Sequence, residues 1–308
     1  GDVAVLFHDK SPAAYAAMLA CLQLGVIYVN LDPDSPWERL HRILSTCRPR
    51  LVVNAFAALP YAAELEADGY RSTLHLRDLP PPDAQSAAPA DGQVFDGGSP
   101  AYIMFTSGST GMPKAVINTQ EMMCANAAMM MQVRPRDPNG PVATMLDWMP
   151  WNHTMGGNAA FHPILVDGGT LYIDDGRPMP GQIEETLRNL REISPTYYAN
   201  VPAGYAALAA AMEKDDALCR SFFKNLSIMA YGGARLPDDL YDRMQALAVK
   251  TTGERIVFYT GWGSTETAPT STGTYWDTER VGLIGLPFPG VELKMVPCGS
   301  KYELRLRG

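Results

Sequence analysis

The chain has 308 residues, of which 46% are hydrophobic and 19% are charged. This length and composition allow one large or two moderate hydrophobic cores, so disorder is not expected. The formal net charge of −8 argues against a nucleic-acid partner, because binding to a phosphate backbone requires a basic face. The five cysteines lie far apart without C-x-x-C spacing, which predicts neither a disulfide framework nor a zinc site and fits a reducing cytoplasm.

The first hundred residues alternate apolar runs with helical patterns. We expect strands at residues 3–7, 26–31 and 51–53, separated by helices at residues 12–24 and 36–47. This βαβ rhythm is typical of a parallel sheet covered by helices. The most apolar run, residues 13–24, begins after Ser11 and Pro12 and ends at Gly25. It predicts a packing helix too short to cross a bilayer, so we expect no membrane partner.

A connector rich in proline, alanine and glycine at residues 78–100 predicts a subdomain border. After it we expect strands near residues 143–146, 170–173, 196–198, 227–229 and 256–259. Helices are expected near residues 121–131, 182–192, 203–212 and 238–249, and a β-hairpin at residues 291–296 and 302–306. The predicted fold class is α/β. We expect a first subdomain at residues 1–100 and a second at residues 101–285. Residues 286–308 are expected to begin a small β subdomain.

The most informative segment is residues 102–116, where two β-prone apolar runs enclose a loop of small hydroxyl residues, glycines and one lysine. Glycines let backbone amides approach anionic oxygens, hydroxyls add donors, and Lys114 supplies a cation. A strand on each flank argues against a flexible linker. A kinase-type P-loop is excluded, because Ala115 stands where a metal-binding hydroxyl is needed. We predict a polyphosphate site made of Thr106, Ser107, Gly108, Ser109, Thr110, Gly111 and Lys114.

Two further glycine-containing segments follow the carboxyl ends of predicted strands, where open α/β sheets gather ligands. Residues 231–236 read YGGARL and residues 261–266 read GWGSTE. Both segments combine small residues with groups that can bind a nucleotide. We therefore expect them to lie beside the same ligand as the loop.

Together these segments resemble the motifs of the adenylate-forming superfamily, which comprises acyl-CoA synthetases, luciferases and peptide-synthetase adenylation domains. The loop is similar to the pattern T-S-G-[ST]-T-G-x-P-K-G-V, from which only Ala115 departs. Residues 261–266 resemble G-Y-G-x-T-E, with Trp262 in place of the tyrosine, and residues 302–308 resemble G-E-L-x-x-x-G. Four motifs in the family's order identify the chain as a member, and the resemblance implies the fold of the family's large N-terminal domain.

The resemblance also implies roles for individual residues. The ring of Trp262 would lie against adenine, Thr265 would bond the α-phosphate, and Glu266 would help to hold magnesium, for which a carboxylate is a suitable hard ligand. Core packing is the alternative role of Trp262. The implied catalytic residues are Lys114, His153, Thr265 and Glu266. Besides the loop, the nucleotide would contact Gly232, Gly233, Ala234, Gly261, Trp262, Gly263, Ser264 and Thr265.

The substrate class is inferred from residues 147–158. In acyl- and aryl-CoA synthetases a P-x-x-H segment places its ring at the carboxylate end of the acyl pocket, and Pro150 to His153 matches it. A lone histidine is otherwise more often structural. Together with residues 169–176, 189–192, 253–258 and 265–269, the segment is similar to feruloyl-CoA synthases and related aryl-CoA ligases. This resemblance implies an aromatic acid that ATP and coenzyme A convert through an acyl-adenylate to a thioester. The expected pocket walls are Met155, Ala159, Tyr231, Gly232, Gly233 and Gly261.

Residues 25–40 keep a second interpretation open, because they resemble the A-Y-V-P-L-D-P-x-x-P-x-x-R-L signature of amino-acid adenylation domains. Such domains pair the substrate ammonium with an aspartate, and only Asp147 stands near His153 in the sequence. A non-catalytic ATP-binding module is a third interpretation. Homodimerisation also stays open.

The chain begins in a strand-like run without an initiating methionine, and it ends at a motif that the family follows with more protein. We therefore expect it to be truncated at both ends. The resemblance implies a continuation with an aspartate for the ribose and a small mobile domain whose lysine assists adenylation. These residues alone are expected to bind ATP weakly and to turn over poorly.

Overall fold

The structure is a computed structural model that describes residues 1–79, 95–107, 112–135, 137 and 139–308. The chain forms two compact units. The first unit comprises residues 1–125 and 150–157, and the second comprises residues 126–149 and 158–308. No helix in the described ranges is long and apolar enough to span a bilayer.

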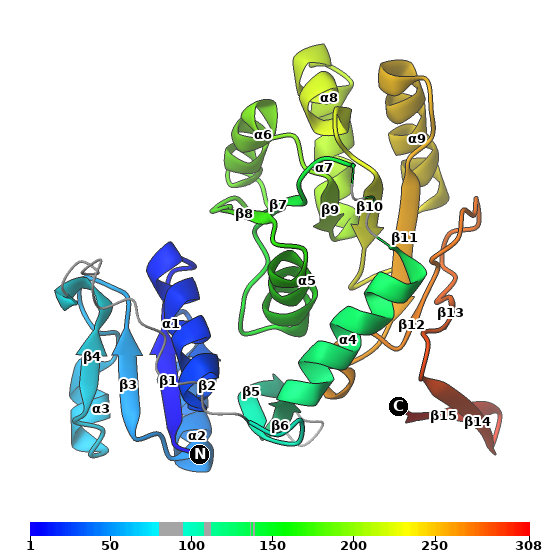
Figure 1. The fold of residues 1–308 in the computed structure, drawn as a ribbon. Coiled ribbons are helices and arrows are strands. Elements are labelled where there is room, and N and C mark those ends of the chain that lie inside the picture. Colours follow the sequence, from blue (N-terminus) through cyan, green and yellow to red (C-terminus); the bar gives the residue numbers. More distant parts are fainter. Residues whose placement is uncertain (80–94, 108–111, 136, 138) are drawn as a thin grey trace. The chain divides into compact units, whose positions relative to one another are not determined.

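The first unit is built on a six-stranded sheet in the order β4-β3-β1-β2-β5-β6 (Figure 1). All neighbouring strands run parallel except β5 and β6, which form an antiparallel hairpin. The strands are β1 (Val3–Phe7), β2 (Ile27–Leu31), β3 (Leu51–Asn54), β4 (Thr73–His75), β5 (Pro100–Ser107) and β6 (Pro113–Thr119). The helices between them are α1 (Pro12–Leu24), α2 (Trp37–Cys47) and α3 (Ala62–Ala67), and a 3₁₀ turn spans Leu76–Asp78.

Helix α1 has the ends that its sequence predicts. The Ser11 hydroxyl accepts a hydrogen bond from the Ala14 backbone amide at 3.3 Å, and Pro12 occupies the first turn. Gly25 closes the helix in the left-handed conformation with φ of 67°, which glycine adopts without steric cost. The helix buries Met18 and Cys21.

The hairpin β5–β6 completes the sheet of the first unit. Tyr102 pairs with Tyr28 of β2, and the two buried rings stack with their centroids 5.1 Å apart. The border expected at residue 100 therefore does not separate β5 and β6, the strands on either side of the predicted phosphate loop, from the first sheet. The reason is the pairing of β2 with β5, which cannot be predicted from the composition of residues 78–100.

The second unit is built on a five-stranded sheet in the order β13-β12-β11-β10-β9, in which β9, β10 and β11 are parallel (Figure 1). The strands of this sheet are β9 (Tyr197–Asn200), β10 (Ile228–Tyr231), β11 (Val257–Trp262), β12 (Thr272–Gly273) and β13 (Leu286–Pro287). The helices are α4 (Gln120–Val133), which begins in the first unit, α5 (Phe161–Val166), α6 (Ile183–Glu192), α7 (Pro202–Met212), α8 (Asp216–Phe223) and α9 (Asp238–Thr252).

A large apolar core fixes the strands of the second unit. Tyr198, Tyr205, Phe222 and Phe258 meet in edge-to-face contacts with centroids 5.0 to 5.9 Å apart. The Tyr205 hydroxyl is hydrogen-bonded at 2.9 Å to the carbonyl of Tyr198 and at 2.9 Å to that of Ala230. This buried hydroxyl links β9 to β10 and so holds the register that positions their carboxyl ends.

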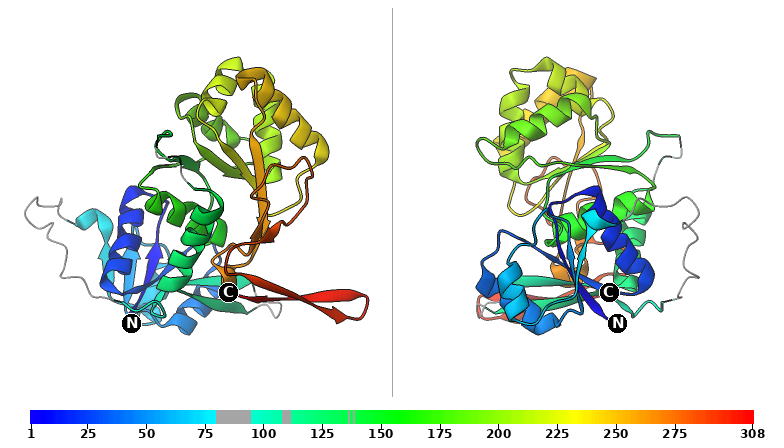
Figure 2. Two further views of the ribbon diagram at one scale, coloured as in Figure 1. Left: turned by 45° about the vertical axis from the view of Figure 1, so that its right-hand side comes forward. Right: turned by 90° about the vertical axis from the view of Figure 1, so that its left-hand side faces the viewer.

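Two smaller pairs complete the second unit. Strands β7 (Thr144–Asp147) and β8 (Thr170–Ile173) run parallel, and β14 (Glu292–Cys298) and β15 (Lys301–Arg307) form the long two-stranded ribbon visible in Figure 2. The ribbon was predicted as a hairpin, and its strands extend closer to the turn than expected. The sequence did not predict α3, β4, α5, α8 or the π-helical turn at Met155–Ala160, because these elements are short or lack a clear apolar period.

Candidate functional site

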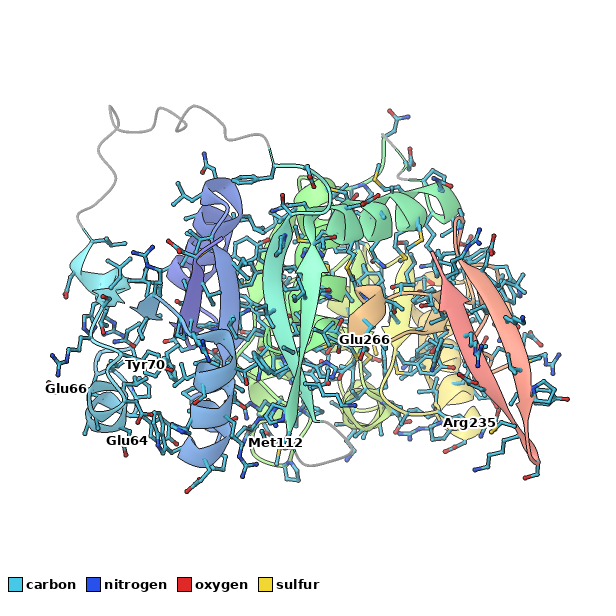
Figure 3. All side chains as sticks on the ribbon, turned by 90° about the horizontal axis from the view of Figure 1, so that it is seen from below. Glu64, Glu66, Tyr70, Met112, Arg235 and Glu266 are labelled. Atoms are coloured by element: carbon cyan, nitrogen blue, oxygen red, sulfur yellow. The ribbon has the colours of Figure 1, made fainter. Side chains whose placement is uncertain are left out.

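The two ends of the predicted phosphate loop face each other across the hairpin. Thr106 at the end of β5 is the cross-strand partner of Lys114 on β6, and Ser107 is the partner of Pro113. The lysine is exposed, and no carboxylate pairs with it among the described residues. Its ammonium is therefore available to an anion. Gly108, Ser109, Thr110 and Gly111 lie outside the described residues, and the next residue, Met112, is 52% exposed (Figure 3).

In the second unit the structure brings the two glycine-containing segments together. Tyr231, the last residue of β10, is the register partner of Thr260 on β11, directly before Gly261. The Thr260 hydroxyl donates a hydrogen bond to the Tyr231 carbonyl at 3.0 Å. Gly233 has φ of +80°, a backbone conformation that favours glycine. Residues 231–234 and 261–266 therefore form one neighbourhood at the carboxyl edge of the parallel strands, where such sheets bind ligands.

Strand β11 continues into its motif rather than ending before it. Gly261 and Trp262 pair with Gly273 and Thr272 of β12. A Cβ atom on Gly261 would lie 2.4 Å from the Thr272 carbonyl oxygen, so the close approach of the two strands requires glycine here. The expected end of this strand at residue 259 is corrected by the pairing with β12. As a result, Gly261 and Trp262 are held in place by a sheet rather than by a loop.

A short 3₁₀ turn presents the next two predicted residues, Thr265 and Glu266. Ser264 and Thr267 form a reciprocal capping box around it, and the Thr267 hydroxyl also bonds the Pro269 carbonyl at 2.8 Å. Glu266 is exposed, and within the described ranges its carboxylate has no hydrogen-bond or ion-pair partner (Figure 3). An exposed single carboxylate suits magnesium, which keeps several waters and is usually shared between one or two carboxylates and substrate phosphates.

Among the described residues no three His, Cys, Asp or Glu side chains gather into a metal-binding cluster. A magnesium ion held by Glu266 would therefore need its other ligands from water and from the nucleotide. That is the usual arrangement for this ion beside phosphates.

The side chain of Tyr231 does not line the neighbourhood of the two motifs. It is buried, its ring lies 5.6 Å from that of Phe258, and its hydroxyl accepts a hydrogen bond from the Gly282 amide at 3.2 Å. Of the predicted pocket walls, this residue can contribute only its backbone. Gly232 and Gly233 follow it and add no side chain of their own.

His153 belongs to the first unit, where its ring is held in one orientation. Its Nδ1 accepts a hydrogen bond from the Met155 amide at 3.2 Å, which places the ring proton of the neutral tautomer on Nε2. The residue is exposed, but partial desolvation of the ring by the surrounding protein lowers the pKa of the imidazole below its ordinary value of 6.5. His153 is therefore neutral near pH 7 and offers an Nε2–H donor to an anionic oxygen.

Glycine is also required just after His153. A Cβ atom on Gly157 would lie 2.4 Å from the Trp151 carbonyl oxygen and 2.5 Å from the terminal methyl of Met104. This tight turn fixes the course of the chain after the predicted P-x-x-H segment. Met155, a predicted pocket wall, is the first residue of the turn.

The predicted site residues thus fall into two groups. Thr106, Lys114, His153 and Met155 lie in the first unit, and the predicted residues from Ala159 to Glu266 lie in the second. That both groups contact one nucleotide and one acid remains a prediction. Sequence reasoning missed Arg134 and Tyr259, which line or flank a cavity beside Ala159. The only sequence signal for Arg134 was its place, followed by a proline, directly after a methionine-rich helix.

Comparison with known proteins agrees with these motifs. The sequence model of the family described as AMP-binding enzyme matches residues 1–303. The nonribosomal peptide synthetase sidE of Aspergillus fumigatus is 29% identical over 318 residues, which cover 99% of this chain and 14% of that protein. The anthranilate–CoA ligase of Pseudomonas aeruginosa is 27% identical over 306 residues, which cover 96% of this chain and 55% of the ligase.

Solved structures show the same fold. A malonyl-CoA ligase in a ternary product complex with methylmalonyl-CoA and AMP matches with a TM-score of 0.77 at 24% identity, over 99% of this chain and 62% of that one. The chain therefore spans less than two thirds of each of these three proteins. Because the family's sequence model covers nearly all of it, the chain belongs to the AMP-binding enzyme family.

Proposed function

We propose that this chain carries the adenylation site of an acid–thiol ligase. In the proposed reaction the carboxylate of an acid attacks the α-phosphorus of ATP and pyrophosphate leaves, giving an acyl-adenylate. The thiol of coenzyme A then attacks the acyl carbon and AMP leaves, giving a thioester. The observation that carries the proposal is the register of Tyr231 with Thr260, which places the two glycine-containing motifs side by side at the carboxyl edge of β10 and β11.

The residues supply the charges and donors that this chemistry needs. The Lys114 ammonium and the amides of the loop would neutralise the triphosphate, and the Thr265 hydroxyl would donate to the α-phosphate. The Nε2–H of neutral His153 would orient the attacking carboxylate without protonating it. Magnesium bound at Glu266 would neutralise charge that develops on the phosphate oxygens.

For the acid, we propose an aromatic substrate of the hydroxycinnamate type, such as ferulate. Gly232, Gly233 and Ala159 add little side-chain volume beside a planar ring, whereas the space beside Gly261 is taken by the Thr272 carbonyl. The similarity to an anthranilate–CoA ligase, whose substrate is an aromatic acid by name, supports this class. An ATP-dependent reaction and five free cysteines fit a cytoplasmic protein.

A second candidate is amino-acid adenylation, which the similarity to a peptide synthetase over 99% of the chain favours. Asp147 is the acid that could pair a substrate ammonium, because it is buried at the end of β7. Its Oδ1 already accepts a hydrogen bond from the Met149 amide at 3.2 Å. Because this contact already gives the carboxylate a structural role, we rank the aromatic acid first.

Acid-dependent exchange of labelled pyrophosphate into ATP tests the proposal. It would be measured on this chain, and on any longer protein that contains it, with ferulate, coumarate, benzoate and a set of amino acids. Exchange with hydroxycinnamates supports the proposal, and exchange only with amino acids replaces it by the second candidate. ATP binding without exchange for any acid would leave a nucleotide-binding module and reject both enzymatic functions.

A further inference from the structure

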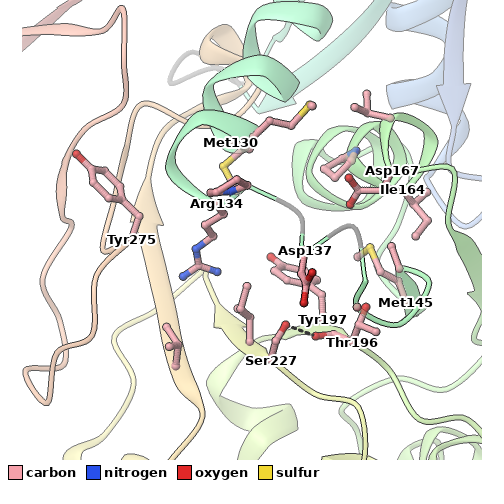
Figure 4. Close-up of a pocket in the computed structure, with 18 of the residues that line it drawn as sticks. Met130, Arg134, Asp137, Met145, Ile164, Asp167, Thr196, Tyr197, Ser227 and Tyr275 are labelled. Carbon is pink, nitrogen blue, oxygen red and sulfur yellow. Dashed lines mark hydrogen bonds between the residues drawn. The ribbon is translucent and has the colours of Figure 1, made fainter.

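The second unit contains a cavity of about 620 Å³ that the sequence motifs do not account for (Figure 4). It lies at the amino ends of the parallel strands, because Tyr197, Ile228 and Val257 are the first residues of β9, β10 and β11 and line its wall. The opposite wall comes from α4 and α5. Most of the lining is apolar and includes Ala127, Met130, Met131, Met145, Ile164 and Val166.

One cation enters this apolar space. Figure 4 shows Arg134 extending from the end of α4 into the cavity, on the side that faces Tyr197. Its Nη1 is buried and has no hydrogen-bond partner among the described residues, nor does any described carboxylate form an ion pair with it. Its guanidinium carbon lies 4.7 Å from the centre of the Tyr259 ring, so the stacked ring holds the group in place.

A buried charge of this kind is costly unless an acceptor satisfies it. Burial lowers the pKa of Arg134 from its ordinary value of 12.5, yet an arginine keeps its proton in a protein at neutral pH. Burial also raises the pKa of Tyr197 to about 12, so its hydroxyl stays a donor. The cavity therefore presents two donors to an occupant and provides no described acceptor for the Nη1 group.

The carboxylates on the cavity wall do not fill this role. Asp137 and Asp277 are exposed, and Oδ1 of Asp137 accepts the Asn139 amide at 2.9 Å. Asp167 is half-buried and has an interaction partner of its own. Burial is the main influence on the pKa of Arg134, and the titratable groups that also act on it are Tyr197 and Tyr259 rather than an aspartate. None of these aspartates forms an ion pair with the Arg134 guanidinium among the described residues.

Tyr259 connects Arg134 with the predicted adenylation motif. Its hydroxyl lies 3.1 Å from the position that a Cβ atom on Gly261 would take, and its ring stacks on the Arg134 guanidinium. Val257 in the cavity wall and Gly261 in the motif are four residues apart on β11, a separation of about 13 Å. Ala159, a predicted wall of the acid pocket, also lines the cavity.

We propose that this cavity is the far end of the acid site, and that Arg134 selects acids with an oxygen function at the end of an apolar body opposite the reacting carboxylate. The inference rests on the proposed function. The far oxygen accepts a charge-assisted hydrogen bond from Nη1 of Arg134, and the Tyr197 hydroxyl adds a second donor. Arg134 is a specificity-determining residue in this arrangement and takes no part in the reaction at phosphorus.

Matched pairs of acids test the inference on the unaltered chain. Calorimetric titration compares 4-hydroxycinnamate and 4-carboxycinnamate with cinnamate, which has the same body without the far oxygen. A hydrogen bond to a charged group predicts that at least one of the oxygen-bearing acids binds about 10- to 100-fold more tightly than cinnamate. Which of the two gains distinguishes a phenol ligand from a dicarboxylate. Equal dissociation constants for all three acids would overturn the inference, and this result does not depend on any variant.

Arg134→Met keeps much of the side-chain volume and removes the donors. The expected result is that the preference for the far oxygen disappears while cinnamate binding stays within about threefold. Arg220→Met is the matched control, because Arg220 is an exposed residue of α8 and should leave the preference unchanged. A preference that survives Arg134→Met, or an equal loss for all three acids, would reject the role of Arg134.

Two more readouts separate the possible failures. A non-hydrolysable acyl-adenylate analogue of the preferred acid should displace that acid completely. If both bind at once, the cavity is a separate site and the inference is overturned. An Arg134-dependent preference without pyrophosphate exchange for any acid would count against the proposed adenylation and leave the ligand preference of the cavity intact.

Discussion

Gly263 and Pro269 approach so closely that a Cβ atom on Gly263 would lie 1.7 Å from the Pro269 carbonyl oxygen. The same carbonyl accepts a hydrogen bond from the Thr267 hydroxyl. This contact closes the turn that carries Thr265 and Glu266. The conformation of the predicted magnesium and phosphate residues therefore depends on the absence of a side chain at Gly263.

We expect Gly263→Ala to open this turn, because the carbonyl is backbone and cannot rotate away. The free energy of unfolding should fall by about 1 to 3 kcal/mol, as for an overpacked site, and ATP binding should weaken as well. Chemical denaturation and nucleotide titration measure the two effects. Gly98→Ala is the control, since a Cβ atom there meets only an aspartate side-chain oxygen at 3.2 Å. Unchanged stability and ATP affinity in Gly263→Ala would contradict the expectation.

Lys114 and Glu266 are both exposed, so their replacement should leave the fold intact. If both act on one triphosphate, Lys114→Met and Glu266→Gln should each reduce pyrophosphate exchange by about 100- to 1000-fold. The double variant should lose less than the product of the single losses, because residues that act as a unit are not additive. Lys301→Met on the β15 strand is the charge-matched control. Strictly multiplicative losses would argue that the two residues act independently.

The lowered pKa of His153 predicts a pH dependence of the proposed reaction. Above this pKa the ring is neutral with its proton on Nε2, and it donates to the substrate carboxylate. As the pH falls through the pKa of His153, Nδ1 gains a proton and can no longer accept the hydrogen bond from the Met155 amide. The local turn is then expected to change. The acidic limb of kcat/KM for exchange should therefore lie below pH 6.5 and shift or vanish in His153→Gln, in which the side-chain amide does not titrate. An unchanged limb in this variant assigns it to another group.

Two buried histidines predict a loss of stability in acid. Burial lowers the pKa of His8 and of His162 from 6.5 to about 4. Both rings are neutral in the folded chain, whereas the unfolded chain takes up protons as the pH falls below 6.5. Above pH 6.5 the two histidines should therefore not reduce the free energy of unfolding. By pH 4 this free energy should fall by up to about 3 kcal/mol per histidine.

His8→Gln tests this linkage, because the amide oxygen can still accept the Lys10 amide that Nδ1 accepts at 3.2 Å. The variant should show a smaller fall in unfolding free energy between pH 7 and pH 4 than the unaltered chain. Measurements at pH 8 report any loss of packing, since no histidine effect is expected there. Parallel curves for the two proteins would show that His8 does not contribute.

Tyr205→Phe should weaken the second unit. The change removes the hydroxyl that bonds two carbonyls on neighbouring strands, and these acceptors are buried. The expected loss in the free energy of unfolding is about 1 to 3 kcal/mol. Tyr172→Phe is the matched control, because Tyr172 is 42% exposed and should change stability little. Equal effects of the two substitutions would reject a special role for the Tyr205 hydroxyl.

The local features of this protein were predictable from the order of its residues. Ser11, Pro12 and Gly25 fixed the ends of α1, because caps and turns depend on neighbouring residues alone. The apolar runs of β1 and β8 predicted both strands with their observed bounds, because a run of this kind is also a feature of neighbouring residues. The α/β class and membership of the family likewise followed from motifs that are contiguous in the chain.

Other features arose only from contacts between distant segments. The pairing of Tyr28 with Tyr102 placed β5, the strand before the predicted phosphate loop, in the first sheet, and the pairing of Gly261 with Gly273 extended β11 through its motif. Arg134 became a candidate site residue only when folding stacked it on Tyr259, 125 positions further along the chain. Strand register and the burial of a charge depend on residues that are remote in sequence. Tertiary structure therefore decides them, and no local pattern encodes them.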